Sequence, residues 1–198
     1  MKKLSILSVM LLTAALVFSG CKAQADDSSD PFSECSETVD SVVMTDGTWT
    51  ITNSDSGSMY GISYKEDMKL KATVANNDYT FTSGTAVIAM KTKDVLREEY
   101  EDYKTLPAAY KKMIEDKMKE EMEEMLSSMG TVTKSTMNDE NITVELELSN
   151  TLLSYMKSSL NLNNLPSGTV IKTNKENTKY ILEVPMNGKT VTYYASKD

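Results

Sequence analysis

Four methionine side chains have the type and spacing that suggest metal chemistry. Met118, Met122, Met125 and Met129 recur at steps of three or four within residues 107–129, a segment whose pattern predicts an amphipathic helix. Thioether sulfur is a soft ligand that suits Cu(I). The same spacing is typical of an apolar helix seam, in which Met fills irregular gaps or contacts a partner helix. We expect the seam and no metal site, with Cu(I) binding by the four sulfurs as the alternative.

The chain of 198 residues contains no histidine. It therefore lacks the Ser-His and Cys-His arrangements and the usual general base at neutral pH, and a zinc site would lack its most frequent nitrogen ligand. Adjacent carboxylates such as Glu120-Glu121 and Glu123-Glu124 fall on the charged face of the predicted helix, where water and lysine surround them. No glycine-rich segment has the spacing of a phosphate-binding loop. We predict a protein that is not an enzyme and has no catalytic residues and no cofactor.

Cys21 is the residue whose context predicts a covalent modification. It follows Lys2 and Lys3, an apolar segment, and the small residues Ser19 and Gly20. These are the three parts of an export signal. A helix that spans a bilayer needs roughly 20 apolar residues, and this segment is shorter. We therefore expect residues 1–20 to be a cleaved signal peptide.

The junction Phe18-Ser19-Gly20-Cys21 resembles the lipobox of bacterial lipoproteins. The resemblance implies that the Cys21 thiol receives a diacylglyceryl group, that the signal is cut away before it, and that an acyl chain such as palmitate is added to the new amino terminus. Lys22 follows the cysteine instead of the Asp that marks inner-membrane retention in some enteric bacteria. The resemblance predicts an exported lipoprotein of the cell envelope, attached through Cys21 to the outer membrane rather than the inner.

The mature chain is acidic. Loss of Lys2 and Lys3 with the signal changes the formal charge from −8 to −10. Nucleic-acid binding depends on contacts of Lys and Arg with phosphate, and anionic headgroups attract basic segments. We therefore expect no nucleic-acid partner, and membrane attachment through lipid alone.

The segment after the anchor is rich in Asp, Glu and Ser. Residues 22–43 offer little apolar surface to bury, which predicts a disordered acidic linker. Cys35 lies in this segment, and it has no partner within the chain if Cys21 carries lipid, so a disulfide framework is excluded. We expect residues 44–198 to form a single globular domain, because their number suits one core.

Apolar and polar residues alternate through much of this domain. Trp49 and Ile51 alternate with threonines, and the clearest run is Ile142 to Leu148. This period of two predicts strands with one buried face. The Asn76-Asn77-Asp78 and Asn187-Gly188 segments predict hairpin turns. We expect an α+β fold, mainly an antiparallel sheet or barrel of about 8–10 strands.

Two helical segments interrupt the strands. The pattern predicts a long helical insertion over residues 94–129, broken at Pro107 and ended by Gly130, and a short helix over residues 150–160. The insertion separates two groups of predicted strands.

Gly47-Thr48-Trp49, together with the strand Tyr79-Thr80-Phe81-Thr82, resembles the lipocalin-like small barrels. The resemblance implies that inward aromatic side chains line a cavity for a small apolar ligand, and a solid core is the alternative. The residues assigned to this lining are Trp49, Tyr79, Phe81, Tyr180 and Tyr193. We predict a lipid-anchored binding or interaction module for a protein partner, with a lipocalin-like carrier of a small apolar ligand as the alternative.

Overall fold

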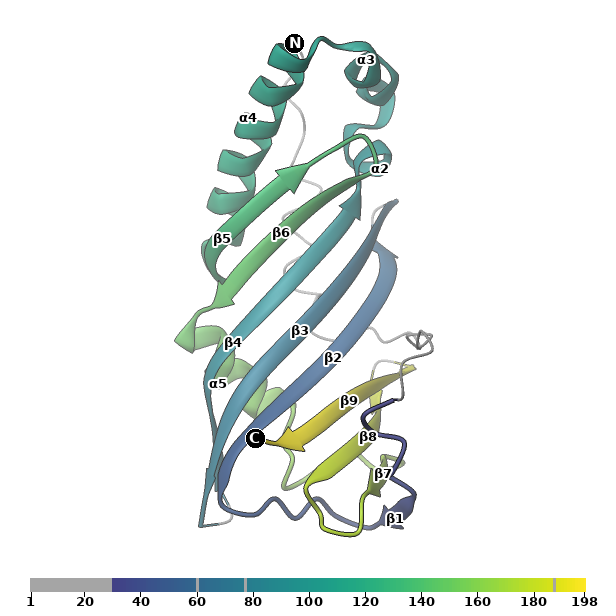
Figure 1. Ribbon diagram of the computed structural model, residues 1–198, viewed down its shortest axis with the longest axis vertical. Helices are drawn as coiled ribbons and strands as arrows, with labels where there is room; N and C mark the ends of the chain where they lie inside the picture. Colours follow the sequence, from purple (N-terminus) through teal and green to yellow (C-terminus); the bar gives the residue numbers. More distant parts are fainter. Residues whose placement is uncertain (1–29, 60, 77, 187) are drawn as a thin grey trace.

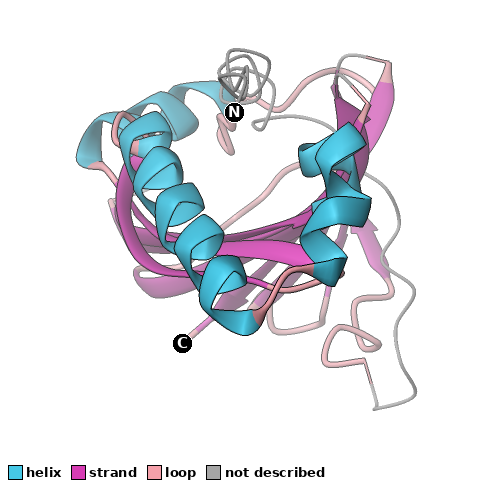
Figure 2. Ribbon diagram, turned by 90° about the horizontal axis from the view of Figure 1, so that it is seen from above, coloured by secondary structure: helices cyan, strands magenta, loops and turns pink. Residues whose placement is uncertain are grey.

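The computed structural model describes residues 30–198 except 60, 77 and 187, and it places them in one curved antiparallel sheet with helices on one face (Figures 1 and 2). The predicted signal peptide, Cys21 and the first part of the predicted linker lie outside the described residues. The strands are β1 (Glu37–Val39), β2 (Gly47–Met59), β3 (Ile62–Ala75), β4 (Asp78–Lys91), β5 (Gly130–Met137), β6 (Asn141–Leu148), β7 (Val170–Thr173), β8 (Lys179–Met186) and β9 (Lys189–Lys197).

The sheet is open. Its strand order is β1-β7-β8-β9-β2-β3-β4-β6-β5, so β1 and β5 are the two edges and are not paired with each other in the described residues. The prediction of a mainly antiparallel sheet within an α+β fold is confirmed, whereas a lipocalin-like barrel is not. A barrel requires the first and last strands to pair, and here the edge strand β1 has only three residues.

The alternation of apolar residues creates the core face. In β3 every second residue from Ile62 is buried except Met68, which is partly buried, and Trp49 in β2 pairs with Ala72 in β3 on the same face. The β6 run is buried in the same way from Ile142 to Leu148. Side chains of a strand point alternately to opposite faces, so the apolar phase of each strand determines which face collects the core.

The helices cover this core face (Figure 2). They are α2 (Thr92–Leu96), a 3-10 turn η2 (Arg97–Glu99), α3 (Tyr100–Thr105), α4 (Ala108–Leu126) and α5 (Asn150–Ser159). α4 packs against β5, and α5 packs against β4. The predicted break is confirmed, because Leu106 is extended and Pro107 precedes the first turn of α4.

Gly130 has a different role from the predicted helix terminator. α4 ends at Leu126, and Gly130 is the first residue of β5, paired with Leu148. A Cβ atom at this position would collide with the backbone carbonyl oxygen of Glu147. Glycine is therefore required by the close approach of two backbones.

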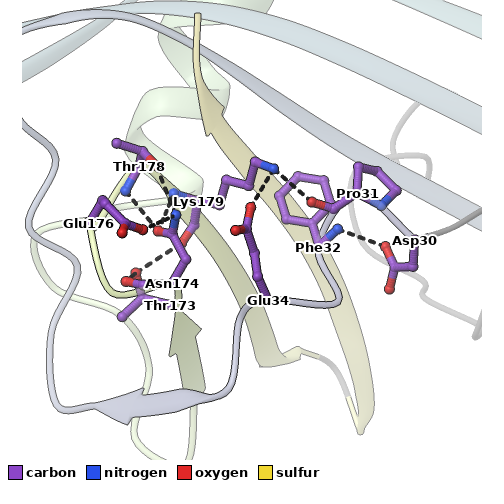
Figure 3. A network of polar contacts seen from close by, with 9 residues as sticks. All are labelled: Asp30, Pro31, Phe32, Glu34, Thr173, Asn174, Glu176, Thr178 and Lys179. Atoms are coloured by element: carbon purple, nitrogen blue, oxygen red, sulfur yellow. Dashed lines mark hydrogen bonds and ion pairs between the residues drawn. The ribbon is translucent and has the colours of Figure 1, made fainter.

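The described part of the predicted linker, residues 30–43, contacts the last strands of the domain. Lys179 Nζ forms an ion pair with Glu34 Oε1 at 2.6 Å and donates to the Pro31 carbonyl oxygen at 2.9 Å (Figure 3). The Phe32 ring packs against Tyr194, with ring centroids 5.1 Å apart. We call residues 30–36 the clamp. Residues from the last two strands, Lys179 and Tyr194, therefore hold this acidic segment against the sheet.

Cys35, within the clamp, is buried, and its burial raises the pKa of the thiol. Immediately after it, β1 adds to the sheet by pairing with β7, from Glu37↔Thr173 to Val39↔Ile171. The ordered domain therefore includes at least residues 30–43 in addition to the predicted range 44–198.

Candidate functional site

The five aromatic residues predicted to line a cavity are all buried in one core cluster on the core face of the sheet. Trp49 packs on Tyr180 with ring centroids 5.9 Å apart, and Tyr79 packs on Phe81 at 5.5 Å. Tyr193 lies on β9. Their inward direction is confirmed, but among them only Tyr79 lines the apolar pocket described below.

The Trp49–Tyr180 pair holds the segment that leads into β2. Trp49 Nε1–H donates to the Thr45 carbonyl oxygen at 2.9 Å, and the Tyr180 hydroxyl donates to the Val43 carbonyl oxygen at 2.9 Å. Buried Trp and Tyr side chains usually satisfy their polar atoms in this way. The two rings therefore position residues 42–45 across the end of the sheet.

A pocket of about 300 Å³ lies at this end of the molecule. We call it the foot pocket. Its lining is mostly apolar and comes from the segment before β2, the β3–β4 hairpin and the loop after α5: Val42, Val43, Met44, Val74, Asp78, Tyr79, Leu162 and Asn163. Two other hollows, beside α4, are lined mainly by charged and polar side chains. The foot pocket is thus the hollow suited to an apolar group.

Tyr79 fixes one wall of the foot pocket. Its hydroxyl donates to the Leu160 carbonyl oxygen at 2.5 Å and accepts a hydrogen bond from the Leu162 backbone N–H at 3.3 Å. At the rim, Lys157 Nζ lies 3.0 and 3.1 Å from the two carboxylate oxygens of Asp78, and these hydrogen bonds lower the pKa of Asp78. The pocket therefore combines a rigid apolar wall with one ion pair at its edge.

A second unusual feature of the core face is a pair of buried carboxyl groups. Asp55 in β2 and Glu66 in β3 are direct cross-strand partners, and each is 5% exposed. Neither residue is among the site residues predicted from the sequence, although Asp55 continues the inward phase of Trp49, Ile51 and Asn53, and Glu66 that of Ile62 and Tyr64. A carboxyl residue at a position that the alternation assigns to the core is the signal that could have found them.

Burial and like charge determine the electrostatics of this pair. Burial, together with the charges of Asp55 and Asp67, raises the pKa of Glu66 to about 8. The Asp55 carboxyl group accepts two hydrogen bonds. Oδ1 accepts from the Ser56 backbone N–H at 2.7 Å, and Oδ2 accepts from the Tyr64 hydroxyl at 3.5 Å. At neutral pH burial therefore favours the protonated form of Glu66.

The methionine seam belongs to the core. Met118, Met122 and Met129 are buried in the same apolar cluster as the sheet residues, and Met125 packs against that cluster while partly exposed. This placement confirms the predicted packing role of the seam. Cu(I) binding stays a hypothesis, and within the described residues no group of three or more His, Cys, Asp or Glu side chains is arranged to hold a metal ion.

Comparisons with known proteins give no relative. The chain matches no protein family, no curated protein and no solved structure. Within the described residues, no helix has both the length and the apolar character needed to cross a membrane.

Proposed function

We propose that the protein is a bacterial envelope lipoprotein, anchored through Cys21, whose domain is a non-enzymatic module that binds a small apolar ligand in the foot pocket. The observation that supports ligand binding is the apolar lining of this pocket by Val42, Val43, Met44, Val74 and Leu162. Small-molecule sites are mostly apolar hollows with a few polar groups that orient the ligand. The Asp78–Lys157 ion pair is such a polar group.

The size of the pocket limits the ligand. About 300 Å³ is at the lower end of the range for ligand sites and equals the liquid volume of roughly ten water molecules. A ligand of about that size, or one end of a longer molecule, fits. A lipocalin-like carrier function does not need a closed barrel here, because the segment before β2 and the loop after α5 line the pocket on the sides that the sheet leaves open.

The clamp shortens the proposed tether. Asp30 is the first residue described, and it is nine positions after Cys21. A flexible chain of that length spans about 15–18 Å on average, whereas a linker that continued to residue 43 would span about 25 Å. The clamp contacts β8 and β9, so a lipid at Cys21 would hold that side of the domain close to the membrane.

Replacing Cys21 with Ser tests the anchor. We expect the Cys21→Ser variant to lose incorporation of a fatty-acid probe and to move from the membrane fraction to the soluble fraction, because the oxygen of serine does not accept the diacylglyceryl group. Cys35→Ser is the matched control and should keep both label and membrane association. Label and membrane association that persist in Cys21→Ser would refute the anchor.

Filling the foot pocket tests ligand binding. Val43 lines the pocket with a side chain that is 60% exposed, so Val43→Trp should occupy the pocket without disturbing the core. Native mass spectrometry of the wild-type protein purified from cells should show an additional bound mass, which Val43→Trp should reduce at least tenfold. Val170→Trp, at another exposed valine, is the control and should retain it. The ligand hypothesis fails if the wild-type protein carries no additional mass, or if Val43→Trp carries as much as the control.

A further inference from the structure

The Asp55–Glu66 pair lacks the partner that buried carboxylates normally have. Within the described residues, neither side chain forms an ion pair with Lys or Arg, and no hydrogen bond to the Glu66 carboxyl group is found. Burying a carboxylate without a compensating charge is costly. On the opposite side of the pair, β4 presents the apolar Ile88 to Glu66. A buried acid pair of this kind therefore needs a proton or a cation.

Tyr193 supplies a second observation at the same place. Its side chain is 3% exposed, and the contact found for its hydroxyl is the Met186 sulfur at 3.9 Å, which is a weak acceptor. Burial, together with the charges of Glu66 and Asp55, raises the pKa of Tyr193, which lies on β9 near the acid pair. The Tyr193 hydroxyl is therefore able to form a stronger hydrogen bond with a ligand.

The sheet divides beside these residues. β9 pairs with β2 only as far as Asn53↔Tyr193, whereas the pairing of β9 with β8 continues to Lys189↔Met186 (Figure 1). At the point of division, Asn53 Nδ2 donates to the Thr192 carbonyl oxygen at 3.0 Å. Beyond it, Asp55 lies on a part of β2 that has β3 as its neighbour but not β9.

We propose that Asp55, Glu66 and Tyr193 form a binding site for the ammonium or guanidinium group of an organic cation. The two carboxylates accept its N–H groups, and the aromatic rings of Tyr64 and Tyr193 beside them favour an organic cation. A calcium ion would need six to eight oxygen ligands, more than this pair offers. Binding exchanges one cation for one proton: Glu66 releases its proton to solvent and becomes the carboxylate that holds the cation.

Calorimetric titration of the mature protein with methylguanidinium chloride tests this exchange. We expect binding to release up to one proton, measured from the heats in two buffers of different ionisation enthalpy, because Glu66 is largely protonated at neutral pH. The association constant should be roughly fiftyfold lower about two pH units below 8 than at pH 8, because binding must displace one proton. The titratable groups on the same face as Glu66 are Asp55 from β2, Tyr64 from β3 and Tyr193 from β9, and its chain neighbour Asp67 is exposed on the opposite face.

Three variants and one competitor make the result decisive. Glu66→Gln should abolish proton release and weaken binding at least tenfold, and Asp55→Asn should weaken it similarly. Glu147→Gln, at an exposed position on the opposite face of the sheet, should bind as the wild type does. The proposal is overturned by absence of methylguanidinium binding at millimolar concentration, by equal binding in Glu66→Gln, or by calcium chloride displacing the probe, which would indicate a metal site.

Discussion

Replacing Glu66 with Gln is expected to stabilise the folded protein above about pH 8 and to change its stability much less below about pH 4.5. In the folded state burial raises the pKa of Glu66 from 4.5 to about 8. Between these two values the folded state binds more protons than the unfolded state, so the free energy of unfolding decreases as the pH rises. The full loss is on the order of 3–5 kcal/mol. Gln cannot ionise and avoids this loss.

Urea unfolding of both proteins across this pH range measures the effect. The carboxyl groups of Asp67, Asp78, Asp94 and Asp198 have lowered pKa values, so they contribute stability that is lost only on acidification. They are present in both proteins, and the difference between the two curves therefore isolates Glu66. Glu147→Gln is the control and should follow the wild-type curve. Parallel curves for wild type and Glu66→Gln would show that Glu66 is not a buried acid.

The strands could be predicted from the sequence because local alternation determines them. The hairpin between β3 and β4 and the run of β6 follow from residues that are neighbours in the chain. The alternation also places Trp49 and Ile51 on the core face, as the structure does. What alternation does not give is the length of β2, whose residues 53–58 are polar or Gly and have the composition of a loop. Their pairing with β3, in register from Asn53↔Met68 to Ser58↔Ser63, keeps them in the sheet.

The clamp and the foot pocket could not be predicted because they depend on partners distant in sequence. The clamp needs Lys179 and Tyr194 from the last strands to bind Glu34 and Phe32. Similarly, the foot pocket exists because Tyr79 holds the loop after α5 against the β3–β4 hairpin. Composition reports the tendency of each segment alone, and it cannot report a pocket that three segments build together.

The acid pair shows the same limit more sharply. Asp55 and Glu66 each interrupt an apolar phase, and either one alone could lie at an exposed bend. Only the register of β2 with β3 makes them direct neighbours, and only the helices and sheet around them make them buried. Because isolated buried charge is costly, the retention of both groups on the core face is the physical basis for expecting a function there.

Trp49→Ala is expected to produce the largest loss of stability among core substitutions, about 3–5 kcal/mol. Trp49 is completely buried, packs on Tyr180 and donates its indole N–H to the Thr45 carbonyl oxygen. Removal leaves a cavity and an unsatisfied carbonyl group at the segment that covers the foot pocket. Urea unfolding should therefore show a lower midpoint.

The same variant should loosen the segment before β2. Val43 N–H donates to the Tyr180 hydroxyl at 3.3 Å, so hydrogen exchange at Val43 should accelerate when the Trp49 ring no longer supports Tyr180. Trp49→Phe should fall between the wild type and Trp49→Ala in both measurements. Tyr155→Ala, which removes an aromatic ring that is 55% exposed, should change stability by no more than about 0.5 kcal/mol. Equal losses in Trp49→Ala and Tyr155→Ala would mean that Trp49 does not organise this end of the core.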